Sequence, residues 1–582
     1  MPPQSSHAAQ FINVARLDEI EEGHSLLVEV AATSVALFRQ DGRVHAVDNR
    51  CPHMGFPLHL GSAQCGILTC HWHHARFDLA SGGTFDPWAD DVRAYPVLVE
   101  DDCIWIDISP PSASETERLS ARLSEGMKRS ISLIIAKSVV GLEQAGASET
   151  VALGVGAEFG TRYSRNGWGS GLTVLTAMGN ILPRLAAEDR SRALYHGLVQ
   201  VAGQTAGRAP AFPLNPLPAG DTDPSLLKQW FRQFVEMRDQ EAAERVLMTA
   251  LLNAEMGMAA VADMLFAAAT DHVYLNGGHT LDFINKAFEL LDLIGWEHAA
   301  QVLPSLIPEL VGARRSEETS SWRYPIDLAQ LLTNVGMELT DLMDSGNRLL
   351  GEWTGRSVLV EQLLTDDPVA SVEALTTALR TGVTWEDVAG AVALAAARRI
   401  AQFRTSNEFG DWITVLHTFT YANAVHQAMK RAPSLELLRG VFAGALSVYL
   451  DRFLNMPPAP LPRGNPGNPR GDGALLDLLD RQQQVNEAAQ CVADHLASGG
   501  SEEDLMALLG KALLREDAEF HTYQMVEAGF RQCSLLQDPE ERRLIFIAMS
   551  RYLAAHSPTF RASGQTYQTA VRLHKGEALY SD

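Results

Sequence analysis

Two short segments near the N-terminus combine side chains that bind transition metals. Residues 51–61 are CPHMGFPLHLG and residues 70–78 are CHWHHARFD, so Cys51 and His53 are followed by Cys70 and His73. Each half places one thiolate and one imidazole at the tip of a loop. Together they offer two sulfur and two nitrogen ligands, which suits a Cys2His2 zinc ion or a two-iron cluster with cysteines on one iron and histidines on the other.

The pattern C-x-H, 16 intervening residues, then C-x-x-H resembles the Rieske [2Fe-2S] ferredoxin family over about 100 residues. Gly55 and Gly61 in the first segment and the F-D-x-x-S-G sequence after the second also match that family. The resemblance implies that Cys51, His53, Cys70 and His73 hold the cluster. We expect the nearby histidines to be loop residues outside the ligand set, namely His59, His71 and His74.

A Rieske cluster transfers single electrons. Neutral imidazoles on one iron leave the cluster with less negative charge than four thiolates would, which raises its reduction potential. High-potential members of the family carry an additional cysteine pair, and Cys65 has no such partner in the first segment. The resemblance therefore implies a lower-potential domain of the ferredoxin or oxygenase type.

Downstream histidines could form a second metal site. Each lies on or at the start of an expected helix among apolar residues, as it would if several helices converged on a buried metal. A single histidine in such a place is more often a hydrogen-bonded core residue, and several in one domain favour a metal site more than one does. The D/N-x-x-H-x4–5-H iron motif of the usual Rieske oxygenases is not found after residue 110. The candidate ligands are His196, His279, His417, His426 and His521.

Helical spacing restricts this set. His417 and His426 are nine residues apart and face opposite sides of a straight helix, so we expect only one of them to be a ligand. His279 and Lys286 share a face, with Asp282 close to it. The pattern favours a functional role for His279 and a solvated face at Lys286, where Asp282 would be its i, i+4 partner.

The histidine-bearing segments HGLVQVAG, LHTFTYANAVHQA and FHTYQMVEAGFR resemble the questin oxidase-like family across roughly residues 150–580. These are helical non-haem iron proteins that oxidise aromatic polyketides. The resemblance implies iron held by several histidines, in one member with a carboxylated lysine. Gln200 and Gln524 depart from the family pattern, where a histidine and a lysine are expected, and they leave the number of ligands open.

The elements that must position these residues fall into two classes. Short β-branched runs with period-two alternation predict a β-domain over residues 1–109, and the QDGR segment predicts a turn within it. SPPSASETE indicates a linker at residues 110–119. Apolar residues at three- and four-residue spacing then predict an all-helical domain over residues 120–582, interrupted by Pro/Gly-rich loops at 209–224 and 457–473.

Composition narrows the function classes. With 47 basic and 71 acidic residues, the net charge of −24 argues against nucleic acid or an anionic membrane as a partner. No secretory signal is visible, and charges interrupt the apolar runs before they reach membrane-spanning length. Six cysteines in 582 residues do not form a disulfide framework. We therefore expect a cytoplasmic protein.

These observations lead to one hypothesis and two alternatives. The hypothesis is an oxygenase in which an external NAD(P)H-dependent reductase or ferredoxin supplies electrons to the [2Fe-2S] cluster. The cluster then reduces a mononuclear Fe(II) held by some of the five histidines, where O2 is activated to oxidise an apolar, polycyclic aromatic substrate. Because the cluster and the iron must be close, we expect a homo-oligomer. The alternatives are a non-enzymatic electron carrier or redox sensor, and a hydrolase or isomerase with a regulatory Rieske domain.

Overall fold

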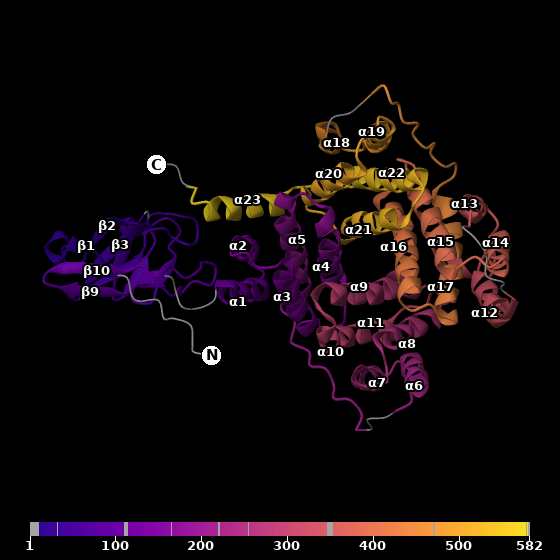
Figure 1. Cartoon of the computed structure of the whole chain (residues 1–582), viewed down its shortest axis with the longest axis horizontal. Helices are drawn as coiled ribbons and strands as arrows, with labels where there is room; N and C mark the ends of the chain where they lie inside the picture. The colour runs from indigo at the N-terminus through magenta and orange to yellow at the C-terminus, as the bar shows by residue number, and fades with distance from the viewer. Residues whose placement is uncertain are drawn as a thin grey trace, which may run out of the picture. The chain divides into compact units, whose positions relative to one another are not determined.

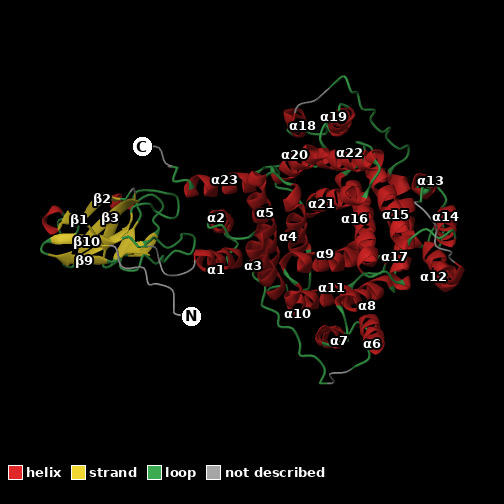
Figure 2. Cartoon of the chain, in the orientation of Figure 1, coloured by secondary structure: helices red, strands yellow, loops and turns green. Residues whose placement is uncertain are grey.

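Strands and helices occupy separate parts of the chain (Figure 1, Figure 2). The computed structural model describes residues 11–31, 33–109, 115–164, 166–218, 222–253, 255–345, 353–468, 472–577 and 579. Among these residues, all strands lie between residues 11 and 107, and the α-helices begin at Glu115. The predicted class, a small β-domain followed by a large helical region, is confirmed.

The β-domain contains three antiparallel sheets, with strand orders β1-β10-β9, β2-β3-β4-β8 and β5-β6-β7. Its described strands are β1 Phe11–Arg16, β2 Ser25–Val30, β3 Thr33–Gln40, β4 Arg43–Asp48, β5 Ser62–Gln64, β6 Ile67–Thr69, β7 Arg76–Asp78, β8 Ala94–Tyr95, β9 Val97–Glu100 and β10 Cys103–Asp107.

The β3–β4 hairpin shows how local sequence sets the register. Asp41 and Gly42 have φ values of 54° and 72°, and Gln40 pairs with Arg43 across the turn. Two consecutive positive φ angles define the tight hairpin turn for which Asp-Gly is a typical sequence. The turn predicted from QDGR is therefore present.

Two loops of the β-domain carry the predicted cluster ligands. We call residues 49–61, between β4 and β5, the first cluster loop, and residues 70–75, between β6 and β7, the second cluster loop. Side chains that are completely buried anchor both, including Val47, Leu58, Leu68 and Phe77. This core fixes the two loops relative to each other.

The chain divides into two compact units, residues 1–148 with 565–582, and residues 149–564. The first unit adds three helical segments to the β-domain: α1 Glu115–Lys128, α2 Ser132–Gln144 and most of α23 Ala562–His574. This division differs from the predicted boundary at 119/120, because α1 and α2 pack with the β-domain. Helix α1 begins inside the predicted linker 110–119, of which residues 110–114 lie outside the described residues.

The second unit is helical throughout its described part. Apart from short 3-10 segments, its helices are α3 Glu149–Arg162, α4 Ser170–Ile181, α5 Ala187–Thr205, α6 Pro224–Glu236, α7 Gln240–Leu252, α8 Met258–Thr270, α9 His279–Ile294, α10 Ala299–Val302, α11 Ile307–Gly312, α12 Leu328–Ser345, α13 Arg356–Leu363, α14 Pro368–Arg380, α15 Trp385–Ala401, α16 Phe409–Arg431, α17 Leu435–Leu450, α18 Asp472–Leu479, α19 Val485–Ala497, α20 Glu502–Leu514, α21 Phe520–Leu535 and α22 Pro539–Ala555. None of the described helices is long and apolar enough to cross a bilayer.

Four helices of the second unit form a closed ring of contacts. Helix α4 packs on α9, α9 on α16, α16 on α21, and α21 on α4. Such an arrangement lets side chains from helices far apart in sequence meet in one interior. Each of the four helices carries polar side chains, among them Asn180 in α4, Lys286 in α9, His417 in α16 and Glu527 in α21.

Candidate metal centres

The two cysteines of the cluster loops begin turns with the same backbone pattern. The Cys51 carbonyl accepts a hydrogen bond from Gly55 N–H at 2.8 Å, and the Cys70 carbonyl accepts one from His74 N–H at 3.0 Å. Each cysteine N–H also donates to the carbonyl oxygen five residues further on. Gly55 and His74 both have positive φ values, 86° and 61°. Because these hydrogen bonds join residues at the same sequence separations in both loops, the two thiols occupy equivalent positions.

The thiols are buried and free of disulfides. Cys51 is 3% exposed and Cys70 is 1% exposed. A hydrogen bond between them lowers the pKa of Cys70 to about 6 and raises that of Cys51. Four backbone N–H groups also donate to these sulfur atoms, from His53 and Met54 and from Trp72 and His73. Such donors stabilise thiolates, the form that binds iron.

The two predicted histidine ligands lie beside each other. The ring centroids of His53 and His73 are 4.9 Å apart, and His53 also contacts Trp88 at 4.7 Å. The buried Nδ1 of His53 has no hydrogen-bond partner among the described residues, which fits a ligand atom. Burial, followed by the charges of His73 and Lys137, lowers the pKa of His53 to about 4. His73 is exposed, so an electron could leave from this side.

The neighbouring histidines lie where loop residues were expected. His59 is held by Asn49, whose Oδ1 lies 2.8 Å from its N–H and 2.9 Å from its Nδ1. His71 and His74 are exposed. Cys65 is an exposed free thiol with a φ of 52°.

A half-buried cation that the sequence did not single out contacts the first cluster loop. Lys137 of α2 donates through Nζ to the Pro52 carbonyl at 2.5 Å and also pairs with Asp90. Arg122 of α1 pairs with the same carboxylate at 2.5 Å. The helices appended to the β-domain thus place the Lys137 ammonium on the carbonyl of Pro52, the residue between Cys51 and His53 in the sequence. Lys137 lies inside the apolar run SISLIIAKSVVGL, which gave no signal of this role.

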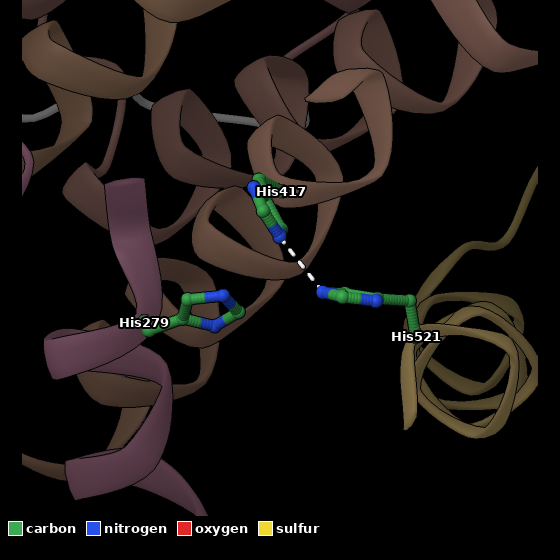
Figure 3. Close-up of side chains that lie close together, drawn as sticks. All are labelled: His279, His417 and His521. Carbon is green, nitrogen blue, oxygen red and sulfur yellow. Dashed lines mark hydrogen bonds between the residues drawn. The ribbon is translucent and has the colours of Figure 1, made fainter. Parts of the chain in front are cut away.

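In the second unit, three of the five candidate histidines converge (Figure 3). His279 begins α9, His417 lies in α16, and His521 is the second residue of α21. Their ligand nitrogens lie within 4.8 Å of one another, and the Nε2 atoms of His417 and His521 are 2.9 Å apart. All three side chains are half-buried. The arrangement could hold one metal ion.

A neighbouring carboxylate and burial favour the neutral, metal-binding form of these imidazoles. Glu519 Oε2 accepts a hydrogen bond from Nδ1–H of His521 at 2.7 Å, which leaves the lone pair on Nε2 facing His417. A carboxylate that orients a metal-binding histidine in this way is a common feature of metal sites. Burial, then nearby histidines, lower the pKa of His279 to about 4 and that of His417 to about 2. The sequence pattern did not single out Glu519, although it stands two residues before His521.

The other two candidates lie outside this group. His196 is buried, and its Nδ1 lies 2.7 Å from the Tyr523 hydroxyl. His426 is nine residues from His417 on the same helix, and its Nδ1 lies 3.2 Å from Gln532 Oε1. Each has a protein partner of its own, so we do not include either in the candidate site. On α16, only His417 contributes.

A ladder of polar pairs continues from the histidines along α9 and α21. His279 lies near His521, with ring centroids 5.8 Å apart. Asp282 accepts a hydrogen bond from Gln524, and Lys286 pairs with Glu527 at 2.6 Å. Glu289 and Arg531 extend the series at 3.5 Å. The pairs follow the same order on both helices and thereby fix the register that brings the histidines together.

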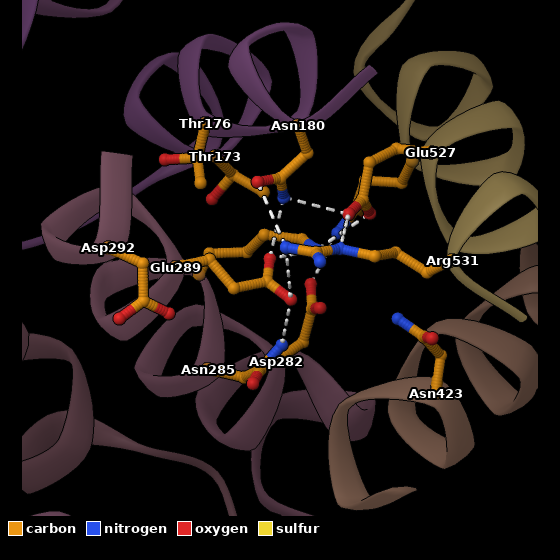
Figure 4. Close-up of polar contacts among 12 residues, drawn as sticks. Thr173, Thr176, Asn180, Asp282, Asn285, Glu289, Asp292, Asn423, Glu527 and Arg531 are labelled. Carbon is orange, nitrogen blue, oxygen red and sulfur yellow. Dashed lines mark hydrogen bonds and ion pairs between the residues drawn. The ribbon is translucent and has the colours of Figure 1, made fainter. Parts of the chain in front are cut away.

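The interior of this ladder is a buried charge network (Figure 4). Lys286 is 1% exposed and lies 2.8 Å from Glu289. Asn180 of α4 donates to both Glu289 and Glu527, at 2.8 and 2.9 Å. The expectation of a solvated Lys286 paired with Asp282 is therefore wrong. Lys286 faces the interior because α9 and α21 supply the carboxylates of Glu289 and Glu527 that compensate its charge, and the Asn180 amide of α4 holds both.

Comparisons with known proteins concern the N-terminal part. The profile described as "Rieske [2Fe-2S] domain" matches residues 10–96. The ferredoxin component of the naphthalene 1,2-dioxygenase/salicylate 5-hydroxylase systems of Ralstonia sp is 33% identical over 16% of this chain and 88% of that protein. The ferredoxin component of the naphthalene 1,2-dioxygenase system of Pseudomonas aeruginosa is 32% identical over 17% of this chain and 97% of that protein.

Human apoptosis-inducing factor 3 is 31% identical over 16% of both chains, so the present chain spans only a small part of that relative. The two ferredoxin components, by contrast, are matched over nearly their whole length. The matching region contains both cluster loops with Cys51, His53, Cys70 and His73. Through its N-terminal domain, this chain belongs to the Rieske [2Fe-2S] domain family.

Proposed function

We propose that this protein is a Rieske-type non-haem iron oxygenase. An external NAD(P)H-dependent reductase or ferredoxin reduces the [2Fe-2S] cluster, held by Cys51, His53, Cys70 and His73. The electrons then reduce a mononuclear iron held by three histidines of the second unit. The observation that carries the proposal is the convergence of His279, His417 and His521, with Glu519 orienting the last of them.

The spacing of these nitrogens suits a single ion. Two ligands at adjacent positions of a six-coordinate metal with bonds of about 2.1 Å lie about 3 Å apart. The 2.9 Å between His417 Nε2 and His521 Nε2 agrees with that separation. Three neutral imidazoles bind Fe(II) well and leave positions for other molecules.

The relatives supply the electron-transfer context. Two of them are, by their names, ferredoxin components of dioxygenase systems. Here the ferredoxin-like domain continues into a helical region with its own candidate metal centre. A bound Fe(II) would supply O2 activation, and the protein would supply the three imidazole ligands and the orienting carboxylate of Glu519.

The substrate class follows from the family resemblance of the helical region. The histidine-bearing helices resemble the questin oxidase-like family, so we propose an apolar, polycyclic aromatic substrate. The cluster and the iron must approach closely for electron transfer, either within one chain or between subunits of a homo-oligomer.

The first experiment is to measure iron and acid-labile sulfide in protein purified anaerobically. We expect three irons and two sulfides per chain, because the cluster contains two of each and the helical site contains one iron. His521→Ala should lower the ratio to two irons and two sulfides and leave the Rieske EPR signal unchanged. Cys70→Ala should remove the Rieske signal.

The alternatives give different results. An electron carrier or redox sensor would contain two irons and two sulfides, would not bind added Fe(II), and would consume no oxygen with reductant. A metal-dependent hydrolase or isomerase would turn over without reductant. Either result would contradict the oxygenase proposal.

A further inference from the structure

A pocket of about 560 Å³ opens beside the three-histidine site of the second unit. His417 is one of its lining residues, so a molecule bound there would lie next to the proposed iron. A volume of this size accommodates a ligand of two or three fused rings. This inference rests on the proposed function, since it concerns the substrate of that site.

Most of the surface that lines the pocket is apolar, and aromatic side chains supply part of it. Tyr274 and Trp322 are buried, with ring centroids 5.8 Å apart. Tyr324 and Phe453 are 75% and 60% exposed, and both line the opening. Exposed aromatic side chains beside a pocket offer flat apolar surface to a ring system. Leu450 and Leu454 complete the apolar lining.

Two adjacent arginines line the same pocket, and among the described residues one of them has an ion-pair partner and the other does not. The Arg315 guanidinium pairs with Glu236 at 3.0 Å, so its charge is compensated. Arg314 is exposed, and its backbone N–H donates to Asn276 at 2.8 Å. Within the described part of the chain, the Arg314 guanidinium has no hydrogen-bond or ion-pair partner. An uncompensated guanidinium beside apolar walls favours a planar anion, which it can bind through two parallel hydrogen bonds.

Among the described residues, no ion pair joins Arg314 to Asp451, the acidic residue of the lining. Asp451 is 4% exposed, and the lining also contains the buried hydroxyls of Thr418 and Ser447, which are hydrogen-bonded to each other at 3.2 Å. Among the described residues of the lining, Asp451, Thr418 and Ser447 are buried, and Arg314 is the cationic side chain that has no ion-pair partner. The pocket therefore offers an apolar surface to a ring system and one position, at Arg314, to an anion.

We propose that this pocket binds an aromatic carboxylate, with its rings against Trp322, Tyr324 and Phe453 and its carboxylate paired with Arg314. The ring system would then lie beside His417, where the oxidation takes place. A neutral polycyclic hydrocarbon would leave the guanidinium without a partner and would bind more weakly.

Calorimetric titration of the anaerobic full-length protein with naphthoate and with naphthalenemethanol tests this proposal. The two probes share their rings, and only naphthoate has a charge. We expect naphthoate to bind about tenfold more tightly, the difference made by one charge-assisted contact. Arg314→Gln should abolish that preference without changing the affinity for the alcohol. Arg314→Lys should retain part of it.

Two further variants complete the design. Arg315→Gln is the matched control and should keep the preference, because Glu236 already compensates that arginine. Phe453→Ala should weaken the binding of both probes. Equal affinity of the wild-type protein for both probes, or a preference unchanged by Arg314→Gln, would overturn the proposal.

Iron analysis of the same preparation distinguishes a failure of this inference from a failure of the proposed function. Three irons per chain with equal binding of both probes would refute the aromatic carboxylate and leave the oxygenase in place. Two irons per chain with an Arg314-dependent preference would support the anion-binding pocket and refute the oxygenase.

Discussion

The Nε2 atoms of His417 and His521 lie 2.9 Å apart, although the two residues are 104 positions apart in the chain. Two ring nitrogens at this distance either share a proton or bind one cation, since two lone pairs facing each other would repel. Glu519 holds Nδ1–H of His521 from the other side, and burial lowers the pKa of His417 to about 2. An imidazolium at His417 is thus disfavoured. A metal ion bound by both nitrogens would remove the repulsion between their lone pairs.

Replacing Glu519 by glutamine is predicted to weaken binding of the third iron by about 10–100-fold, the usual effect of losing a carboxylate that orients a histidine ligand. Equilibrium dialysis against Fe(II), followed by metal analysis, measures the affinity. The exposed Glu318→Gln variant is the control and should bind iron as the wild type does. Unchanged affinity in Glu519→Gln would contradict the orienting role.

His426→Gln should retain three irons per chain. His426 contacts Gln532 and lies outside the three-histidine group, so its loss removes no ligand. Metal analysis of this variant beside His417→Gln gives a direct comparison on one helix. Loss of the third iron from both variants would show that the site is different from the one proposed.

Lys286→Met is predicted to lower the free energy of unfolding by about 3–5 kcal/mol, because the buried carboxylates of Glu289 and Glu527 lose a compensating charge. Urea denaturation followed by circular dichroism measures the change. Lys430→Met is the control: Lys430 pairs with Glu386 at 3.4 Å on the surface, and such pairs contribute about 0–1 kcal/mol. Equal effects of the two substitutions would contradict a compensating role for Lys286.

Lys137→Met should lower the reduction potential of the cluster by tens of millivolts. The Lys137 ammonium contacts the Pro52 carbonyl between Cys51 and His53, and a nearby cation favours the reduced cluster. A redox titration followed by EPR measures the potential. Lys128, an exposed residue at the end of α1, provides the control variant Lys128→Met, whose potential should equal that of the wild type. A merely structural Lys137 would leave the potential unchanged.

The stability contributed by His272 should depend on pH. Its hydrogen bond to Glu317, together with that to Glu236, raises its pKa above the ordinary value of 6.5. A raised pKa in the folded state stabilises the protein fully below the unfolded pKa, and this stabilisation is lost as pH rises through the folded pKa. The difference in unfolding free energy between wild type and His272→Gln should therefore be largest below pH 6.5 and decline above it. A difference that is constant with pH would refute this.

The β-domain could be predicted in detail because its signals are local. The turn predicted from QDGR fixes the β3–β4 register, in which Gln40 pairs with Arg43. The short strands β5, β6 and β7 have three residues each, too few for a periodic pattern, and were not predicted. Lys286 was misjudged because helical spacing identified its face but could not identify the carboxylate that α21 brings to it.

The sequence by itself determined the β-then-helix order, the cluster motif and the list of candidate histidines, because metal-ligand spacing and hydrophobic periodicity are properties of neighbouring residues. Only the tertiary structure decided that His279, His417 and His521 meet while His196 and His426 do not. Their convergence depends on the packing of α9, α16 and α21, and the ladder from Asp282–Gln524 to Glu289–Arg531 sets the register of two of these helices. Such long-range contacts leave no periodic signal in the chain.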